Sequence, residues 1–295
     1  MRKLYRWRLE LWLFNSIGFI ISLLPRKVCL LVGRNLGFLL YIFDKRHRLT
    51  AHKNLEIAFG KERTRKERSR IAKQSFKHFG SIVTDIIKLQ RFPLEKIEKL
   101  ITFSGKEHLE KAKSQGNGIL IFTAHFGNWE VGSLLISKYG KLNVIARRSD
   151  NKLLEEKLIG IRKYFGVHVI YKQLATKKIL QSLRNNETVA ILIDQNVLRS
   201  EAVFVDFFGK KAATTPSVAT FHLRTHAPLI PMFCYPTKSG KYHIRAFPPP
   251  DVNLSGDKKK DIATLTQACT TIIETQIKEN PGLWLWFHDR WKSRP

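Results

Sequence analysis

A histidine and a carboxylate lie five residues apart at His125 and Glu130, within the segment HFGNWE. An uncharged apolar run, Ile119 to Phe122, precedes the histidine and has the length of a buried strand. The pattern becomes helical from Trp129 onward, so Glu130 falls in the first helical turn, where a negative charge is favoured. The sequence therefore predicts a strand that leads to a histidine, a tight turn at Gly127, and a helix that opens on a carboxylate.

The two side chains can act together only if the chain turns between them. Inside one helix, a spacing of five residues would point them about 140° apart. A turn brings them into one cleft above a sheet edge, where α/β folds place their chemistry. Neutral imidazole accepts a proton from a hydroxyl, and a carboxylate on its other nitrogen fixes the tautomer. We interpret His125 as a general base and Glu130 as its orienting partner; a structural histidine and a helix-start charge are the alternative.

No G-x-S-x-G segment is present, so the sequence offers no nucleophile elbow of its own. A base without an internal nucleophile suggests that the attacking hydroxyl belongs to the substrate. Asn128 in the turn is a candidate for substrate binding. Asp194 and Gln195 follow an apolar strand and point to the same cleft, where they are candidates for positioning the acceptor. A plain surface turn at the strand end is the alternative for these two residues.

The charge of the chain is strongly basic, with 52 Lys and Arg against 24 Asp and Glu in 295 residues, or +28. Such a chain is attracted to a polyanion, either nucleic acid or an anionic membrane surface. No helix-turn-helix, zinc or aromatic RNA-binding signature is present, which argues against nucleic acid. The cysteines, Cys29, Cys234 and Cys269, are odd in number and scattered, which fits a reducing compartment and no metal site.

The first 27 residues predict an N-terminal membrane anchor or interfacial helix. Basic residues precede an uncharged stretch, Leu11 to Leu24, of 14 residues. As a helix it would span about 21 Å, short of the ~30 Å hydrocarbon core, so we expect it to dip into one leaflet. A signal peptide is disfavoured by Glu10 and by the lack of an A-x-A-like cleavage site. A hydrophobic helix packed on the domain is the other alternative.

The rest of the chain divides into a basic helical region at 28–100 and an α/β core at 101–295. In the core, short apolar runs alternate with helical patterns, which predicts one mostly parallel sheet flanked by helices. After the first strand and helix we expect strands at 142–146, 167–171, 188–193, 228–235 and 242–246. We expect helices at 151–164, 177–184, 216–224 and 258–278.

Several segments resemble the bacterial lipid A biosynthesis (lauroyl/myristoyl) acyltransferase family, within the glycerolipid acyltransferases. HFGNWE is similar to the family's H-x-x-x-x-(D/E) motif. Further similar blocks follow in the family's order along nearly the whole chain, namely NLEIAFG (54–60), SFKHFG (75–80), ARRSDNKLLEE (146–156), LIDQN (192–196), VFVDFFGKKAATTP (203–216) and WFHDRWKSRP (286–295).

The resemblance implies that His125 is the general base and Glu130 its partner in an acyl transfer. It implies that Arg147 binds phosphate or stabilises an oxyanion, a task suited to a fixed, charged fork. Arg290 and its basic and aromatic neighbours would suit a membrane interface, with a packed C-terminal tail as the alternative. Arg148, at a position where the family favours proline, is one of several departures, and these leave the acceptor open.

The implied function is an O-acyltransferase at the cytoplasmic face of the inner membrane. It would move a fatty acyl chain from an acyl-carrier-protein or coenzyme A thioester to a hydroxyl of a phosphorylated glycolipid, a lipid A precursor, with no metal or redox cofactor. The leaflet, the acceptor and the carrier protein are all negative, which suits the basic chain. A lysophospholipid or another glycolipid is the alternative acceptor. A non-catalytic membrane scaffold is disfavoured by the intact His125 and Glu130.

Overall fold

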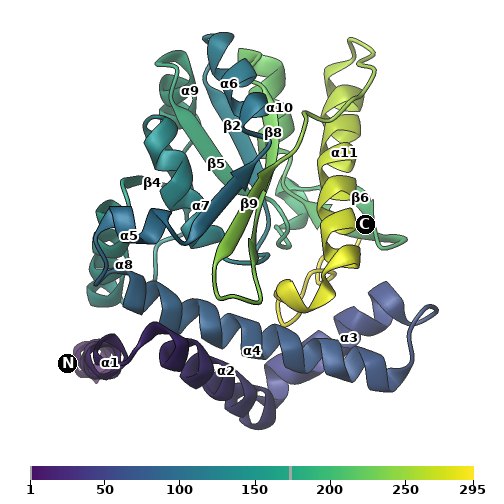
Figure 1. Cartoon of the computed structure of the whole chain (residues 1–295). Coiled ribbons are helices and arrows are strands. Elements are labelled where there is room, and N and C mark those ends of the chain that lie inside the picture. The colour runs from purple at the N-terminus through teal and green to yellow at the C-terminus, as the bar shows by residue number, and fades with distance from the viewer. Residues whose placement is uncertain (1, 173–174) are drawn as a thin grey trace.

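A computed structural model of the chain describes residues 2–172 and 175–295. An all-helical N-terminal part is followed by alternating strands and helices (Figure 1). The helices are α1 (Arg2–Leu23), α2 (Arg26–Phe43), α3 (Lys45–Phe59), α4 (Arg65–Leu89), α5 (Leu94–Glu98), α6 (Lys106–Ser114), α7 (Trp129–Ile136), α8 (Lys152–Tyr164), α9 (Ala175–Arg184), α10 (Ser217–Thr225) and α11 (Lys258–Glu279). The strands are β1 (Ile101–Ser104), β2 (Ile119–Thr123), β3 (Leu142–Ala146), β4 (Val167–Tyr171), β5 (Thr188–Leu192), β6 (Val203–Phe207), β7 (Lys210–Thr214), β8 (Leu229–Pro236) and β9 (Tyr242–Ala246).

A seven-stranded sheet forms the centre of the molecule, in the order β1-β9-β8-β2-β5-β3-β4. The single antiparallel pairing in this order joins β8 to β9, so β2, β3, β4, β5 and β8 run in one direction. Their carboxyl ends therefore meet at one edge of the sheet. The predicted α/β class, with a mostly parallel sheet flanked by helices, is confirmed.

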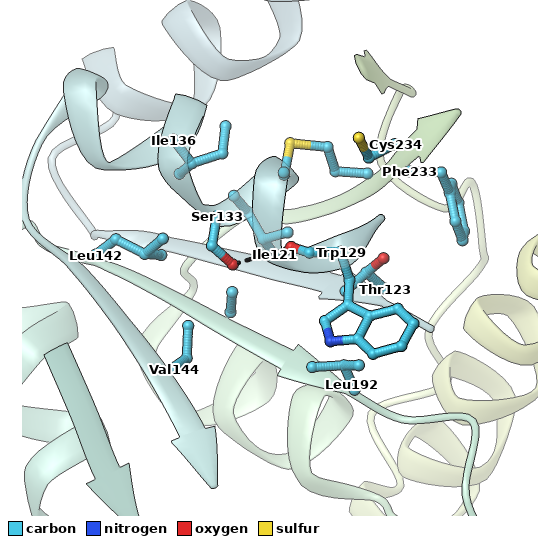
Figure 2. A pocket seen from close by; sticks show the side chains of 13 residues that line it. Ile121, Thr123, Trp129, Ser133, Ile136, Leu142, Val144, Leu192, Phe233 and Cys234 are labelled. Carbon is cyan, nitrogen blue, oxygen red and sulfur yellow. Dashed lines mark hydrogen bonds between the residues drawn. The ribbon is translucent and has the colours of Figure 1, made fainter. Parts of the chain in front are cut away.

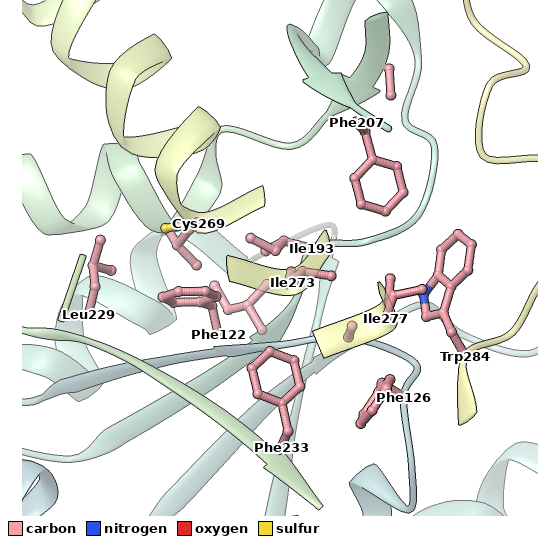
Figure 3. Close-up of a cluster of buried hydrophobic side chains, with 14 of the residues drawn as sticks. Phe122, Phe126, Ile193, Phe207, Leu229, Phe233, Cys269, Ile273, Ile277 and Trp284 are labelled. Atoms are coloured by element: carbon pink, nitrogen blue, oxygen red, sulfur yellow. The ribbon is translucent and has the colours of Figure 1, made fainter. Parts of the chain in front are cut away.

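Strand β2 lies at the middle of the sheet and is buried on both faces. Its alternate residues enter two different cores: Leu120 and Phe122 pack into one, Ile119 and Ile121 into the other. The first core lies between the sheet and α11, where Phe122 packs near Ile273 (Figure 3). Burial on both faces explains why β2 is an unbroken apolar run rather than an alternating one.

The N-terminal helices cross the molecule along the edge of the sheet at which the parallel strands end (Figure 1). Helix α2 packs on α4 through glycines. A Cβ atom at Gly80 would lie 2.0 Å from the carbonyl oxygen of Gly33, and one at Gly37 would lie 2.1 Å from that of Phe76. The two backbones approach this closely because no side chain separates them. Helix α4 is thus fixed between α2 on one side and the α/β part on the other.

Several elements of the fold were not predicted, among them β1 and α6, which precede β2. The segment 203–214 forms an antiparallel hairpin, β6 and β7, that was not predicted. None of the helices in residues 2–172 and 175–295 combines the length and apolar character that a membrane-spanning segment needs. The division of the chain at residues 27 and 100 stays a prediction.

We expect Gly80→Ala to destabilise the protein, because the added methyl group must displace the backbone of α2. Overpacking of this kind lowers the free energy of unfolding by roughly 1–3 kcal/mol. Gly160→Ala in α8 is the matched control, because a Cβ atom there meets nothing within 4 Å. The control should be neutral or stabilising by up to about 1 kcal/mol. Urea unfolding in detergent measures both, and equal midpoints for the two variants would contradict close α2–α4 packing.

Candidate active site

His125 lies just beyond the carboxyl end of β2, on a turn that neighbouring segments hold in place. Gly127 has φ +58°, and a Cβ atom there would lie 1.7 Å from the carbonyl oxygen of Cys234 in β8. The amide of Gly127 donates to Leu283 O at 3.0 Å, and the carbonyl of His125 accepts from Leu285 N at 3.2 Å. Only glycine fits the turn, since it must be left-handed and touch β8.

Asp194 is the residue that orients the imidazole. Its Oδ1 lies 2.9 Å from His125 Nδ1, and its Oδ2 accepts from the His125 amide at 3.0 Å. Trp284 Nε1 donates to the same Oδ2 at 2.7 Å. Burial alone would raise the pKa of Asp194, but His125 and these N–H donors lower it below its ordinary value. A carboxylate at Nδ1 requires the proton there, so Nε2 carries the free lone pair.

The strand register explains why Asp194 reaches the histidine. Strands β2 and β5 are parallel neighbours, with Thr123 paired to Leu192. His125 and Asp194 each lie two residues further along, on the same edge of the sheet. Gln195 follows, and its Nε2 lies 3.4 Å from His125 Nε2. The structure thus brings Asp194 and Gln195 to His125, and their predicted role in positioning the acceptor stays a prediction.

Glu130 lies elsewhere, and its predicted contact with His125 is wrong. Its carboxylate pairs with Arg162 of α8, at 2.7 Å to Nη2 and 3.3 Å to Nε. Glu130 is the second residue of α7 and faces α8, whereas its neighbour Trp129 lies against the imidazole with ring centroids 5.2 Å apart. Burial alone would lower the pKa of Arg162, but Glu130 raises it above its ordinary value. The pair keeps a charged guanidinium beside the turn.

Asn128 is buried, and its side chain is used inside the protein. Its Oδ1 caps α7 by accepting from Val131 N at 3.3 Å, and its Nδ2 donates to the hydroxyl of Tyr242 at 2.8 Å. The expectation that Asn128 contacts the substrate is therefore not matched by its geometry. Arg147 and Arg148 follow β3, at the same edge of the sheet as the His125 turn. The side chain of Arg147 is exposed, and the guanidinium of Arg148 lies over the ring of Tyr171, 4.4 Å from its centroid.

Helices α3 and α4 support the turn and the segment after α11, a role that the sequence analysis missed. His78 lies with its Nε2 3.1 Å from Gly127 O, and burial lowers its pKa to about 4, so the ring is neutral. Ser75 donates to the carbonyl of Trp284. Asn54 donates to the carbonyls of Trp286 at 2.8 Å and of His288. These residues belong to the NLEIAFG and SFKHFG blocks, but nothing in their types distinguished them from ordinary helical positions.

The segment after α11 is packed into the protein rather than presented to a membrane. Trp284, Trp286, Trp291 and Arg290 are all buried. The Arg290 guanidinium donates to the Ala213 carbonyl, and burial lowers its pKa to about 10. The packed-tail alternative is therefore confirmed for these four residues.

A small apolar cavity lies next to Trp129, between α7 and the sheet (Figure 2). Its volume is about 20 Å³, which holds a single water molecule. The lining side chains are almost all apolar and come from α7 and from strands β2, β3, β5 and β8; they include Ile121, Leu142, Val144, Ala190, Leu192 and Met232. Among the described residues, no group of three or more His, Cys, Asp or Glu is arranged to hold a metal ion.

Known proteins resemble the chain over nearly its whole length. The model of the bacterial lipid A biosynthesis acyltransferase family matches residues 1–293. A lipid A biosynthesis lauroyltransferase from Escherichia coli K12 is 25% identical over 96% of this chain and 92% of its own. A lipid A biosynthesis palmitoleoyltransferase from the same organism is 24% identical over 96% and 91%. A phosphatidylinositol mannoside acyltransferase from Mycobacterium tuberculosis H37Rv is 25% identical over 74% and 69%.

The family resemblance seen in the separate blocks therefore holds along the chain as a whole. The edge of the sheet that carries His125 falls within the matched residues. This chain is an acyltransferase and belongs to the bacterial lipid A biosynthesis acyltransferase family.

Proposed function

We propose that the protein transfers a fatty acyl chain from an acyl-carrier-protein or coenzyme A thioester to a hydroxyl of a lipid A precursor. The observation that carries the proposal is the His125–Asp194 pair at the carboxyl edge of the sheet. The side chain of His125 is 23% exposed, and its Nδ1 is held by a buried carboxylate, which leaves Nε2 as the nitrogen that can act as a base. The family and the printed names of the relatives support a lipid A precursor as acceptor.

The chemistry follows from this geometry. Nε2 of His125 takes the proton of the acceptor hydroxyl as its oxygen attacks the thioester carbonyl. The tetrahedral oxyanion collapses, the carbon–sulfur bond breaks, and the imidazolium returns its proton to the leaving thiolate. Asp194 stabilises the imidazolium between these steps. General-base help of this kind supplies roughly 10²–10⁴-fold in rate.

The cations beside the turn suit a phosphorylated acceptor. Arg162 is held by Glu130, and Arg147 and Arg148 follow β3 at the same edge. A guanidinium binds phosphate oxygens through two parallel hydrogen bonds. We infer that Glu130 acts by fixing Arg162 rather than by touching His125. Relatives named phosphatidylinositol mannoside acyltransferases favour another glycolipid as the second candidate acceptor.

The apolar cavity next to Trp129 is the place where we infer that the acyl chain enters. Trp129, whose ring lies against the imidazole of His125, is one of its lining residues, and most of the other lining side chains are apolar (Figure 2). At about 20 Å³ it is too small for a fatty acyl chain, so side chains must move. Met232 is one of the lining residues, and an unbranched thioether changes rotamer readily.

We also propose that α1 and α2 rest on the cytoplasmic face of the inner membrane. Both helices expose apolar side chains, including Trp12, Ile20, Leu31 and Phe43. Scattered single apolar residues are ordinary on a protein surface, but these gather on two consecutive helices. Arg8 and Lys27 are exposed near them, and each basic residue near an anionic leaflet contributes about 1 kcal/mol.

The first experiment tests acceptor and base together. Purified protein in detergent is incubated with labelled acyl-carrier-protein donor and either a tetra-acylated lipid A precursor or a lysophospholipid. We expect transfer to the lipid A precursor, and a loss of at least about 100-fold in kcat for His125→Ala, because the base is removed. If the protein acylated the lysophospholipid but not the lipid A precursor, the proposed acceptor would be wrong.

Matched variants separate the two carboxylates in the same assay. Asp194→Asn should lower kcat, and combining it with His125→Ala should add little, because both residues act as one unit. Arg162→Gln should instead raise KM for the acceptor, because the guanidinium is removed, and Glu130→Gln should raise it less, because the guanidinium remains but is no longer held. If Glu130→Gln lowered kcat as much as His125→Ala did, and Asp194→Asn left kcat unchanged, then Glu130 rather than Asp194 would be the partner of His125.

The cavity is tested with Gly132→Ala. A Cβ atom there would lie 3.6 Å from Cys234 Cβ and 3.9 Å from Met232 Cε, so the variant should fold. The methyl group enters the space we assign to the acyl chain, so discrimination should shift toward shorter donors by about tenfold. The ratio of kcat/KM for a long and a short acyl donor measures it, with Gly160→Ala as control. If this ratio is unchanged in Gly132→Ala, the cavity is not the site of the acyl chain.

Membrane association is tested with vesicles of phosphatidylcholine containing phosphatidylglycerol. The double variant Trp12→Glu, Ile20→Glu places two charges on the apolar face, so we expect the bound fraction in a sedimentation assay to drop about tenfold or more. Leu254→Glu is the control, because Leu254 is also exposed but lies between β9 and α11. Equal binding of the double variant and the control would place the membrane contact elsewhere.

A further inference from the structure

A buried chain of polar contacts connects the beginning of α2 to the turn that carries His125. Arg26 in α2 pairs with Asp85 in α4 through two contacts, Nε to Oδ1 at 2.6 Å and Nη2 to Oδ2 at 2.7 Å. The hydroxyl of Tyr242 in β9 donates to Asp85 Oδ2. The same hydroxyl accepts from Asn128 Nδ2 at 2.8 Å. Four segments far apart in the sequence therefore meet in one connected network.

The direction of each hydrogen bond in this network is fixed. The Asp85 carboxylate, paired with a guanidinium, can only accept, so the Tyr242 hydroxyl must donate to it. Burial and Asp85 raise the pKa of Tyr242 well above its ordinary value, so the phenol keeps its proton. The hydroxyl lone pair that remains faces Asn128 and selects the NH₂ group of its amide. The amide oxygen is thereby directed to Val131 N, where it caps α7.

Stability alone does not account for this arrangement. The side chains of Asp85 and Arg26 are 0% and 13% exposed, and a buried ion pair often adds nothing over well-packed apolar side chains. A buried polar network does specify one orientation of the groups it contains. Here the oriented group is Asn128, three residues after His125 and one after Gly127. The turn has its own backbone contacts to β8 and to Leu283, but the network is what fixes the side chain at its end.

We propose that Arg26, Asp85 and Tyr242 are positioning residues for the reaction, and that they hold the His125 turn in its working geometry through Asn128. The proposal rests on the proposed acyl transfer at His125. None of the three touches the reacting atoms. Arg26 also donates to the Gly240 carbonyl, so the network joins the N-terminal helices to both β9 and the turn. Helices α2 and α4 would thereby help to position the turn in the α/β core.

Tyr242→Phe tests the proposal in the full-length protein, because it removes one oxygen and leaves the ring in place. We expect kcat to drop about ten- to hundredfold, as small misplacements of a catalytic group do, with KM for donor and acceptor within about twofold. Tyr41→Phe is the matched control. Its hydroxyl contacts His52 at 3.1 Å and Ser69 at 3.4 Å, away from the turn, so its kcat should equal that of the wild type.

Hydrogen exchange of the amides at 127–131 gives a second readout that does not depend on the acceptor. Exchange should be faster in Tyr242→Phe than in the wild type and unchanged in Tyr41→Phe. If both variants lose similar thermal stability while kcat and exchange at the turn stay at wild-type values, the network is structural and the proposal is wrong. If the wild type transfers no acyl group, the proposed function fails, while the exchange measurement still decides whether Tyr242 holds the turn.

Discussion

The buried carboxylate of Asp194 is the group around which the site is assembled. It accepts from the backbone and ring of His125 and from the indole of Trp284, three donors from two distant segments. A buried carboxylate is tolerable only when such donors satisfy it, so the turn and the segment after α11 must both be in place. The same contacts fix the histidine tautomer. The need to satisfy the buried Asp194 carboxylate thus determines how the two segments pack and which nitrogen of His125 can act as a base.

Helix α4 helps to hold in place both segments that donate to Asp194, namely the His125 turn and the segment after α11. His78 contacts the turn, Ser75 contacts the segment after α11, and Asp85 reaches the turn through Tyr242. Glycines on its other side bring α2 into backbone contact. A helix that contacts both the α/β core and the N-terminal helices cannot shift without disturbing the turn. The proposed membrane-facing surface and the proposed site are therefore parts of one packed unit.

The sequence predicted six of the strands, from β2 to β5 and β8 and β9, together with the turn at Gly127 and the candidate base, because each has a local signal. It also predicted that Asp194 and Gln195 would reach the cleft, since both follow a strand. It did not predict that Asp194 rather than Glu130 contacts the histidine. That choice depends on β5 being the neighbour of β2 and on the direction in which α7 leaves the turn. Neither strand order nor the partnership of Glu130 with Arg162, 32 residues away, has a local pattern.

The contacts between α3 and the segment after α11 have a kinetic consequence. Asn54 binds the Trp286 and His288 carbonyls across 232 and 234 residues of chain. Pairings this distant in sequence close late, because a large loop entropy opposes them. During synthesis, α3 can pack on α2 and α4 early, but Asn54 stays without its carbonyl partners until the last residues of the chain have been made.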